Sequence, residues 1–137
     1  MSHADFVHLR VRSAFSLLQS TVRVEPLAKA CRAAGMPAVA VADDTNLFAV
    51  MQFCAAAKKA GVQPIVGAMV ALAQAEPIAR VPGRPLPPEH VVLLVKDAQG
   101  YGNLLRLLSR AWVGAEPGSD VKVSLAELEA CNGGLIC

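Results

Sequence analysis

Five residues lie in or at the ends of apolar runs, and their side chains could form one charged site. Arg10 and Arg12 alternate with apolar residues in the first run, Asp43 and Asp44 follow the second, and Met69 lies in the third. If these runs are parallel strands, such side chains collect at the C-terminal ends, where the sites of β/α folds lie. A guanidinium and a carboxylate can share two parallel hydrogen bonds, which satisfies both groups without water. We therefore expect one of the arginines to neutralise the two aspartates.

The same residues allow a simpler interpretation. Residues 43–46 read Asp-Asp-Thr-Asn, a run of helix-capping residue types ahead of a helical pattern. The two arginines share their strand face with His8, and on an edge strand that face could meet water instead of a carboxylate. The two interpretations differ in whether a carboxylate oxygen lies within salt-bridge distance of a guanidinium.

Strand and helix patterns alternate along the chain. Alternating or continuous apolar runs predict four strands and the start of a fifth, at residues 7–12, 38–42, 64–72, 91–95 and 135–137. Apolar stripes at helical spacing cover residues 24–31, 47–54 and 101–112. The second stripe has Leu47, Val50, Met51 and Cys54 on one side. Ser124 and Glu127 form a capping-box pair that opens a short fourth helix.

This order of elements predicts an α/β fold with a parallel sheet. A closed β/α barrel takes about 250 residues, so a chain of 137 residues corresponds to about half of one. We expect the N-terminal part of a distorted β/α barrel, truncated within its fifth strand. The alternative is a complete doubly wound domain of four or five strands. A Pro-rich stretch at 76–89 fits neither pattern and predicts an irregular, exposed excursion.

Composition excludes several classes of protein. No apolar run approaches the ~18 residues of a transmembrane helix, and the N-terminus lacks the order of a secretory signal, so we expect a cytoplasmic protein without a membrane partner. A net charge of +2 does not by itself indicate nucleic-acid binding. The cysteines at 31, 54, 131 and 137 contain no Cys-x-x-Cys pair and no metal-ligand spacing with the histidines. Cys31 and Cys54 fall on apolar helix faces, which favours buried free thiols at these two positions.

Several segments resemble, in the same order, the polymerase and histidinol phosphatase (PHP) domain at the N-terminus of the bacterial DNA polymerase III alpha subunit. Residues 8–16 are similar to the family's opening His-Leu-His-x-His-Ser-x-Tyr-Ser, and residues 38–47 to its Ala-Leu-Ala-Ile-Thr-Asp-His-Gly-Asn-Leu. Residues 61–68 resemble its Gly-Ile-Lys-Pro-Ile-x-Gly-x, which the family follows with glutamate. Two further segments, 100–109 and 134–137, also look like family segments.

Four of the five residues named first depart from the family pattern. The resemblance implies that paired histidines bind metal in the first motif, and those positions here are Arg10 and Arg12. The histidine of the second motif falls on Asp44, the glutamate of the third falls on Met69, and only Asp43 is kept. A guanidinium stays protonated and has no lone pair to offer a cation. We therefore expect a degenerate site with no metal, no other cofactor and no catalytic residue.

The resemblance implies a role as well as a fold. Residues 1–137 would be a partial PHP domain of a DNA-directed DNA polymerase (a nucleotidyltransferase), with the polymerase domains downstream. This segment would act without catalysis of its own, as a structural and partner-docking module in DNA replication. Its expected partners are the remaining polymerase domains of the same chain, the proofreading exonuclease subunit, and DNA through the parent enzyme.

Two alternatives stay open at this point. One is a metal-dependent phosphoesterase or exonuclease that uses ligands beyond residue 137. The other is a free-standing α/β binding domain with no polymerase attached.

Overall fold

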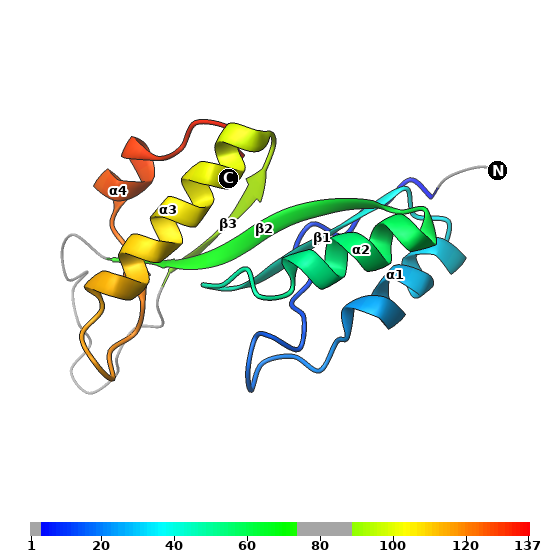
Figure 1. Ribbon diagram of the computed structural model, residues 1–137, viewed down its shortest axis with the longest axis horizontal. Coiled ribbons are helices and arrows are strands. Elements are labelled where there is room, and N and C mark those ends of the chain that lie inside the picture. The colour runs from blue at the N-terminus through cyan, green and yellow to red at the C-terminus, as the bar shows by residue number, and fades with distance from the viewer. Residues whose placement is uncertain (1–3, 74–88) are drawn as a thin grey trace.

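The computed structural model describes residues 4–73 and 89–137 (Figure 1). The helices in these residues are α1 (Val24–Ala33), α2 (Val50–Ala60), α3 (Ala98–Gly114) and α4 (Leu125–Ala130). The strands are β1 (Ala38–Asp44), β2 (Gln63–Leu72), β3 (His90–Val95), β4 (Lys122–Val123) and β5 (Leu135–Ile136). The α/β fold class is thus confirmed. Most of the Pro-rich stretch at 76–89 lies outside the described residues.

The strands form one mixed sheet in the order β1-β2-β3-β5, and β4 pairs with the end of β2. Strand β1 runs parallel to β2, as expected. The two-residue strand β4, which the sequence patterns did not predict, is also parallel to β2. The prediction of a parallel sheet is wrong for β3, which is antiparallel to both β2 and β5. A parallel pair needs a long crossover, usually through a helix, and the sequence between β2 and β3 has no helical pattern. The alternation of strand and helix patterns therefore predicted the wrong direction for β3.

The segment predicted as a first strand at 7–12 lies beside β1, but it is not a regular strand. Its only ladder pairing among the described residues is a parallel bridge between Val11 and Val41. The Ala40 N–H donates to the His8 carbonyl at 2.8 Å, and the Ala42 N–H donates to the Val11 carbonyl at 2.8 Å. These bonds fix the face that each residue presents: Val11 lies on the side of Val41, and the arginines that flank it lie on the other side.

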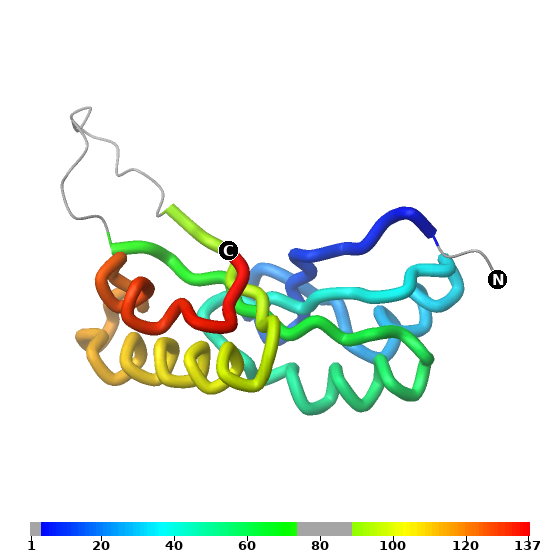
Figure 2. Tube along the Cα trace, turned by 90° about the horizontal axis from the view of Figure 1, so that it is seen from above, coloured from blue at the N-terminus to red at the C-terminus, as the bar shows by residue number. Residues whose placement is uncertain are grey.

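The helices cover one face of the sheet. Figure 2 shows α2 and α3 along one side of β1 and β2, with the dark-blue N-terminal segment on the other side. Val39 and Val41 of β1 pack under α1 and α2 in a cluster that contains the fully buried Phe53. A second cluster joins α3 and α4 to β2 and β3 around Leu93, Leu104 and Leu107. In the middle of β1 the opposite face carries the short side chains of Ala40 and Ala42, which leave room there for long side chains from the N-terminal segment.

The buried stripe of α2 is not the one predicted. Val50, Phe53 and Ala57 are buried, whereas Met51 is 80% exposed and Cys54 is half-buried. Both sides of this helix are apolar in sequence, so its helical spacing alone does not choose between them.

All four cysteines are free. Cys31 and Cys131 are buried, and burial raises the pKa of the Cys31 and Cys54 thiols, so these side chains stay protonated near neutral pH. In the part of the chain that the structure describes, no helix is long and apolar enough to span a membrane.

Candidate functional site

Arg10 and Arg12 converge on a single sulfur atom. The Nη2 atom of Arg10 donates to the Met69 Sδ at 3.3 Å, and the Nη2 atom of Arg12 donates to the same sulfur at 3.2 Å. Met69 is fully buried in β2, whereas Arg10 is exposed and Arg12 is half-buried. Both arginines cross the β1 face that carries Ala40 and Ala42, where short side chains let a guanidinium reach the next strand.

Asp43 is buried and takes its hydrogen bonds from two serines. Its carboxylate accepts from the Ser13 N–H at 2.6 Å, the Ser13 hydroxyl at 2.6 Å and the Ser16 hydroxyl at 2.7 Å. Asp43 is 2% exposed, and both serines are equally buried. The expected arginine–aspartate pair is therefore wrong for Asp43, because hydroxyl and backbone donors satisfy the carboxylate and sulfur receives the guanidinium groups.

Asp44 lies opposite Met69 in the parallel register of β1 and β2. Its carboxylate accepts from the Gln19 Nε2 at 2.8 Å and the Thr45 hydroxyl at 3.0 Å. Adjacent side chains of a strand point to opposite faces, so the two carboxylates take different partners, and none of these partners is an arginine.

The helix-cap interpretation is also wrong. Helix α2 begins only at Val50, and its N-cap is Ala49, which makes no side-chain cap bond. Asn46 instead closes a local turn, with its Oδ1 accepting from the Phe48 N–H at 3.1 Å. Both aspartates belong to the strand, ahead of that turn.

Thr45 forms the turn after β1 and has a left-handed backbone, with φ of 53°. The resemblance aligns this position with a glycine of the family motif, and glycine adopts such a φ without steric cost. The Thr45 N–H donates to the Met69 carbonyl at 2.8 Å, and its own carbonyl accepts from the Trp112 Nε1 at 2.7 Å. Hydrogen bonds to β2 and α3 thus fix the turn that follows the two aspartates.

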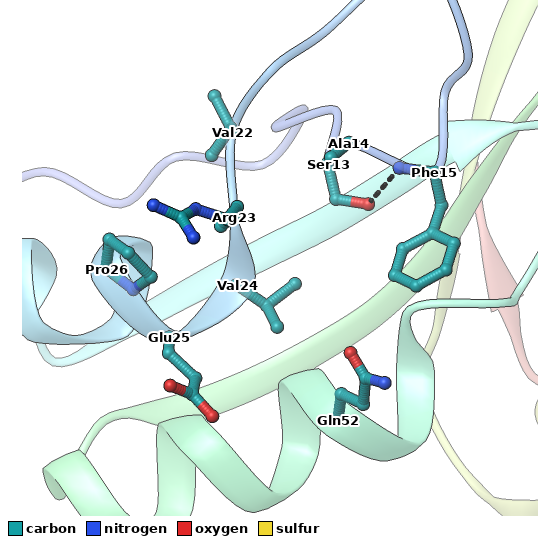
Figure 3. A pocket seen from close by; sticks show the side chains of 9 residues that line it. All are labelled: Ser13, Ala14, Phe15, Val22, Arg23, Val24, Glu25, Pro26 and Gln52. Atoms are coloured by element: carbon teal, nitrogen blue, oxygen red, sulfur yellow. Dashed lines mark hydrogen bonds between the residues drawn. The ribbon is translucent and has the colours of Figure 1, made fainter.

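A cavity of about 420 Å³ lies between the 13–26 segment and α2 (Figure 3). Phe15, Val22 and Val24 give it an apolar lining, with Arg23 and Glu25 among its polar residues. None of the five predicted residues lines it, but Ser13 does, and the Ser13 hydroxyl accepts from the Phe15 N–H at 3.2 Å and donates to Asp43. The sequence patterns did not indicate this cavity.

The structure therefore divides the five predicted residues among three arrangements. Arg10, Arg12 and Met69 form one, and Asp43 with Ser13 and Ser16 forms the second. Asp44, with Gln19 and Thr45, forms the third. Within residues 4–73 and 89–137, no group of three or more His, Cys, Asp or Glu side chains could hold a metal ion.

The roles of Ser13, Ser16 and Trp112 were missed. The two serines match serines of the family's opening motif, which was the available signal for them. Trp112 gave no signal beyond its place in an apolar stripe.

The comparison with protein families matches the PHP domain over residues 8–137. The DNA polymerase III subunit alpha of Pseudomonas fluorescens is 38% identical over 133 residues, which is 97% of this chain and 11% of that protein. The same subunit of Escherichia coli K12 is 39% identical over 112 residues, which is 82% of this chain and 9% of that protein. The chain thus spans about a tenth of the length of these relatives.

Two solved structures share the fold at low identity. A protein described as a metal-dependent phosphoesterase, from Bifidobacterium adolescentis, is 13% identical with a TM-score of 0.52, and the match covers 78% of this chain and 32% of that one. An amidohydrolase from Chromobacterium violaceum is 18% identical with a TM-score of 0.58, covering 79% of this chain and 34% of that one.

Proposed function

The chain belongs to the PHP domain family, and from this membership we propose that it is a non-catalytic PHP region of a bacterial DNA polymerase III alpha subunit. In this proposal the metal site of the family is degenerate, and the domain serves as a structural and docking module in DNA replication.

The convergence of Arg10 and Arg12 on Met69 is the observation that carries the proposal. Metal sites need lone pairs directed at the cation, and a guanidinium offers only donors. The Met69 thioether is a soft ligand, poorly suited to Zn, Mn or Mg beside carboxylates. Two positive charges at this point would also repel a divalent ion, by roughly 4 kcal/mol per unit-charge pair at ~4 Å and an effective dielectric of 20.

The retained aspartate supports the same conclusion. Asp43 accepts three hydrogen bonds from Ser13 and Ser16 and is 2% exposed. A metal ion there would have to displace those donors, which would then be left buried without acceptors. The residues present therefore do not fit a family-type metal ion.

A docking role is supported by large apolar side chains on the surface of the described residues. Phe48 is 69% exposed, Met51 is 80% exposed and Trp112 is 54% exposed. These positions lie on α2, on α3 and on the turn before α2. We propose that they contact the remaining polymerase domains or the proofreading exonuclease subunit, with DNA bound through the parent enzyme.

Metal analysis of the purified full chain tests the degenerate site. We expect no stoichiometric Zn or Mn and no metal-dependent release of phosphate or nucleotides. The matched control restores the family's ligand types through Arg10→His, Arg12→His, Asp44→His and Met69→Glu, and this variant should gain bound metal. Stoichiometric metal in the unsubstituted chain would contradict the proposal and favour a phosphoesterase.

The docking role has its own test. Phe48→Ser and Met51→Ser together should weaken the binding of the proofreading exonuclease at least tenfold in a titration, or should loosen the packing of the polymerase domains in proteolysis. The control is Leu17→Ser, an exposed position in the loop before α1. Unchanged exonuclease affinity together with unchanged proteolysis would contradict the docking role.

A further inference from the structure

We propose that the groove between α1 and α2 binds an acidic, amphipathic helix of a partner protein. This inference goes beyond the proposed function, because it assigns a contact surface whose lining includes neither Phe48, Met51 nor Trp112, and it states the chemistry of what binds there.

Two adjoining cavities form this groove. Helices α1 and α2 lie side by side and pack on the same hydrophobic cluster (Figure 1). The cavity of about 420 Å³ and a second cavity of about 470 Å³ are both lined by Glu25 and Gln52, so they follow one another along the two helices. The groove therefore extends from the segment before α1 to Ala60 at the end of α2.

The α2 wall of the second cavity is a stripe of small residues that differs from the buried stripe of this helix. Ala55, Ala56 and Ala60, with Gln52 and Lys59, recur at the three- and four-residue spacing of one helix face. Ala55 is exposed, and Ala56 and Ala60 are half-buried. Because the distance between two packed helices depends on the side chains at their contact, this stripe allows a third helix to approach closely.

The first cavity offers an apolar anchor point. Phe15, Val22 and Val24 line it, and Figure 3 shows Phe15 and Val24 bordering the same space as Gln52. Its volume of about 420 Å³ accommodates a large apolar side chain of a partner, such as leucine or phenylalanine. Apolar anchors in such pockets carry much of the binding free energy when an amphipathic helix lies in a groove.

The charges of the groove favour an acidic partner. Arg23 lines the first cavity, and Lys29 and Lys59 line the second from α1 and α2. Among the described residues, Glu25 is the only carboxylate in either lining, so three cations face one anion and the balance is positive. Complementary charge speeds association and selects the partner. Nucleic-acid phosphates would also meet the lysines, but they would leave the apolar anchor point unused.

A helical partner suits this surface better than an extended one. An extended peptide binds by adding a strand to the edge of a sheet, whereas the walls of this groove are helices whose backbone groups are bonded within each helix. Lys59 follows Gln52 by seven residues, which is about 10 Å at 1.5 Å per residue. The carboxylates of the partner therefore lie about two helical turns from its apolar anchor.

Fluorescence anisotropy of the full chain with labelled synthetic helical peptides tests the groove at physiological ionic strength. Each peptide carries one leucine anchor and, two turns away, a pair of glutamates, glutamines or lysines, and each is made in both sequence orders. We expect one order of the glutamate peptide to bind at least tenfold more tightly than the lysine peptide. Equal affinity for the glutamate and lysine peptides, or no binding of either glutamate peptide, would overturn the proposal.

Charge reversal in the groove provides a matched pair of variants. Lys59→Glu should weaken binding of the glutamate peptide at least tenfold and should strengthen binding of the lysine peptide. Lys58→Glu makes the same change at the adjacent exposed position, which does not line the groove, and should alter either affinity less than threefold. Equal effects of the two reversals would show general attraction to a basic surface and would also overturn the proposal.

A steric variant tests the groove without changing its charge. Ala55→Trp fills the second cavity from an exposed position and should weaken binding of the glutamate peptide at least tenfold. Ala30→Trp, at an exposed position of α1 outside both linings, is the control and should leave the affinity within threefold. Circular dichroism of each variant shows that α1 and α2 remain folded, and an unchanged affinity in a folded Ala55→Trp would contradict the groove as the binding site.

A short single-stranded oligonucleotide separates a protein partner from a nucleic acid. An oligonucleotide that binds more tightly than the glutamate peptide and is lost in Lys59→Glu, but not in Ala55→Trp, would assign the lysines to nucleic acid and overturn the proposal. The groove variants leave Phe48 and Met51 unchanged, so a failure here is distinguishable from a failure of the docking role proposed for those residues.

Discussion

The indole Nε1 of Trp112 donates a 2.7 Å hydrogen bond to the backbone carbonyl of Thr45. Trp112 lies near the end of α3, and Thr45 directly follows the two aspartates of β1. This bond joins α3, which packs in the cluster around Leu104, to the turn that follows β1, which packs in the cluster around Phe53. The position of the Asp43–Asp44 segment therefore depends on α3, which is far away in the sequence.

Replacing Trp112 by Phe should remove this bond and keep an aromatic ring. We expect the free energy of unfolding to fall by about 1 kcal/mol, the usual net contribution of one hydrogen bond. Urea denaturation measures the change. Val113→Ala, at a neighbouring position that is 88% exposed, is the control and should stay within about 0.5 kcal/mol. Equal effects of the two substitutions would show that the bond does not stabilise the fold.

Thr45→Gly should stabilise the protein. A β-branched residue with φ of 53° stores about 1–3 kcal/mol of backbone strain, and glycine removes it. Glycine also costs about 0.5–1 kcal/mol of backbone entropy and loses the hydroxyl bond to Asp44. We expect a net gain of about 0.5–1 kcal/mol by urea denaturation. Thr21→Gly, at an exposed position without a positive φ, should instead destabilise the protein, and a loss of stability in Thr45→Gly would contradict the strain argument.

Asp43→Ala should destabilise the fold far more than Asp44→Ala. Removing the Asp43 carboxylate leaves three buried donors of Ser13 and Ser16 without an acceptor, at a cost of about 2–4 kcal/mol. The Asp44 bonds are more exposed, and we expect about 1 kcal/mol or less. Chemical denaturation of the two variants provides the comparison, and similar losses would be evidence against the serine–aspartate network. Because Asp43→Ala is expected to destabilise the fold, a loss of activity in this variant would have to be compared with its folded fraction.

The capping box of α4 predicts a specific pH dependence. Hydrogen bonds from the Ser124 N–H and hydroxyl lower the pKa of Glu127 from its ordinary value of 4.5. The folded state thus favours the ionised form, so its stabilisation is fully present above pH 4.5 and is lost as the pH falls through the lowered folded pKa. Glu127→Ala should cost about 1 kcal/mol at neutral pH and progressively less in acid.

Unfolding of the wild type and of Glu127→Ala at several pH values checks this prediction. Glu129→Ala, at an exposed position of the same helix, controls for helix propensity. A stability difference that stays constant from neutral pH to about pH 3 would show that the charge of Glu127 is not involved.

The local patterns of the sequence determined most of the elements and the residue types at the site. Apolar spacing located α1, β1, β2 and α3, and the Ser124–Glu127 pair located the start of α4. The side chains of Arg10 and Arg12 are not metal ligands whatever the fold, because a guanidinium has no lone pair to donate. These conclusions rest on residue type and on neighbours a few positions away, both of which are readable along the chain.

The partners of the site residues were decided only by the tertiary structure. The register of β1 against β2 sets Asp44 opposite Met69, and the alternation of a strand turns Asp43 to the other face. Which apolar side of α2 is buried, and that β3 runs antiparallel, also depend on how distant elements pack. Such choices depend on contacts between residues far apart in sequence, so the arginines were assigned to carboxylates, whereas the fold directs them to a thioether.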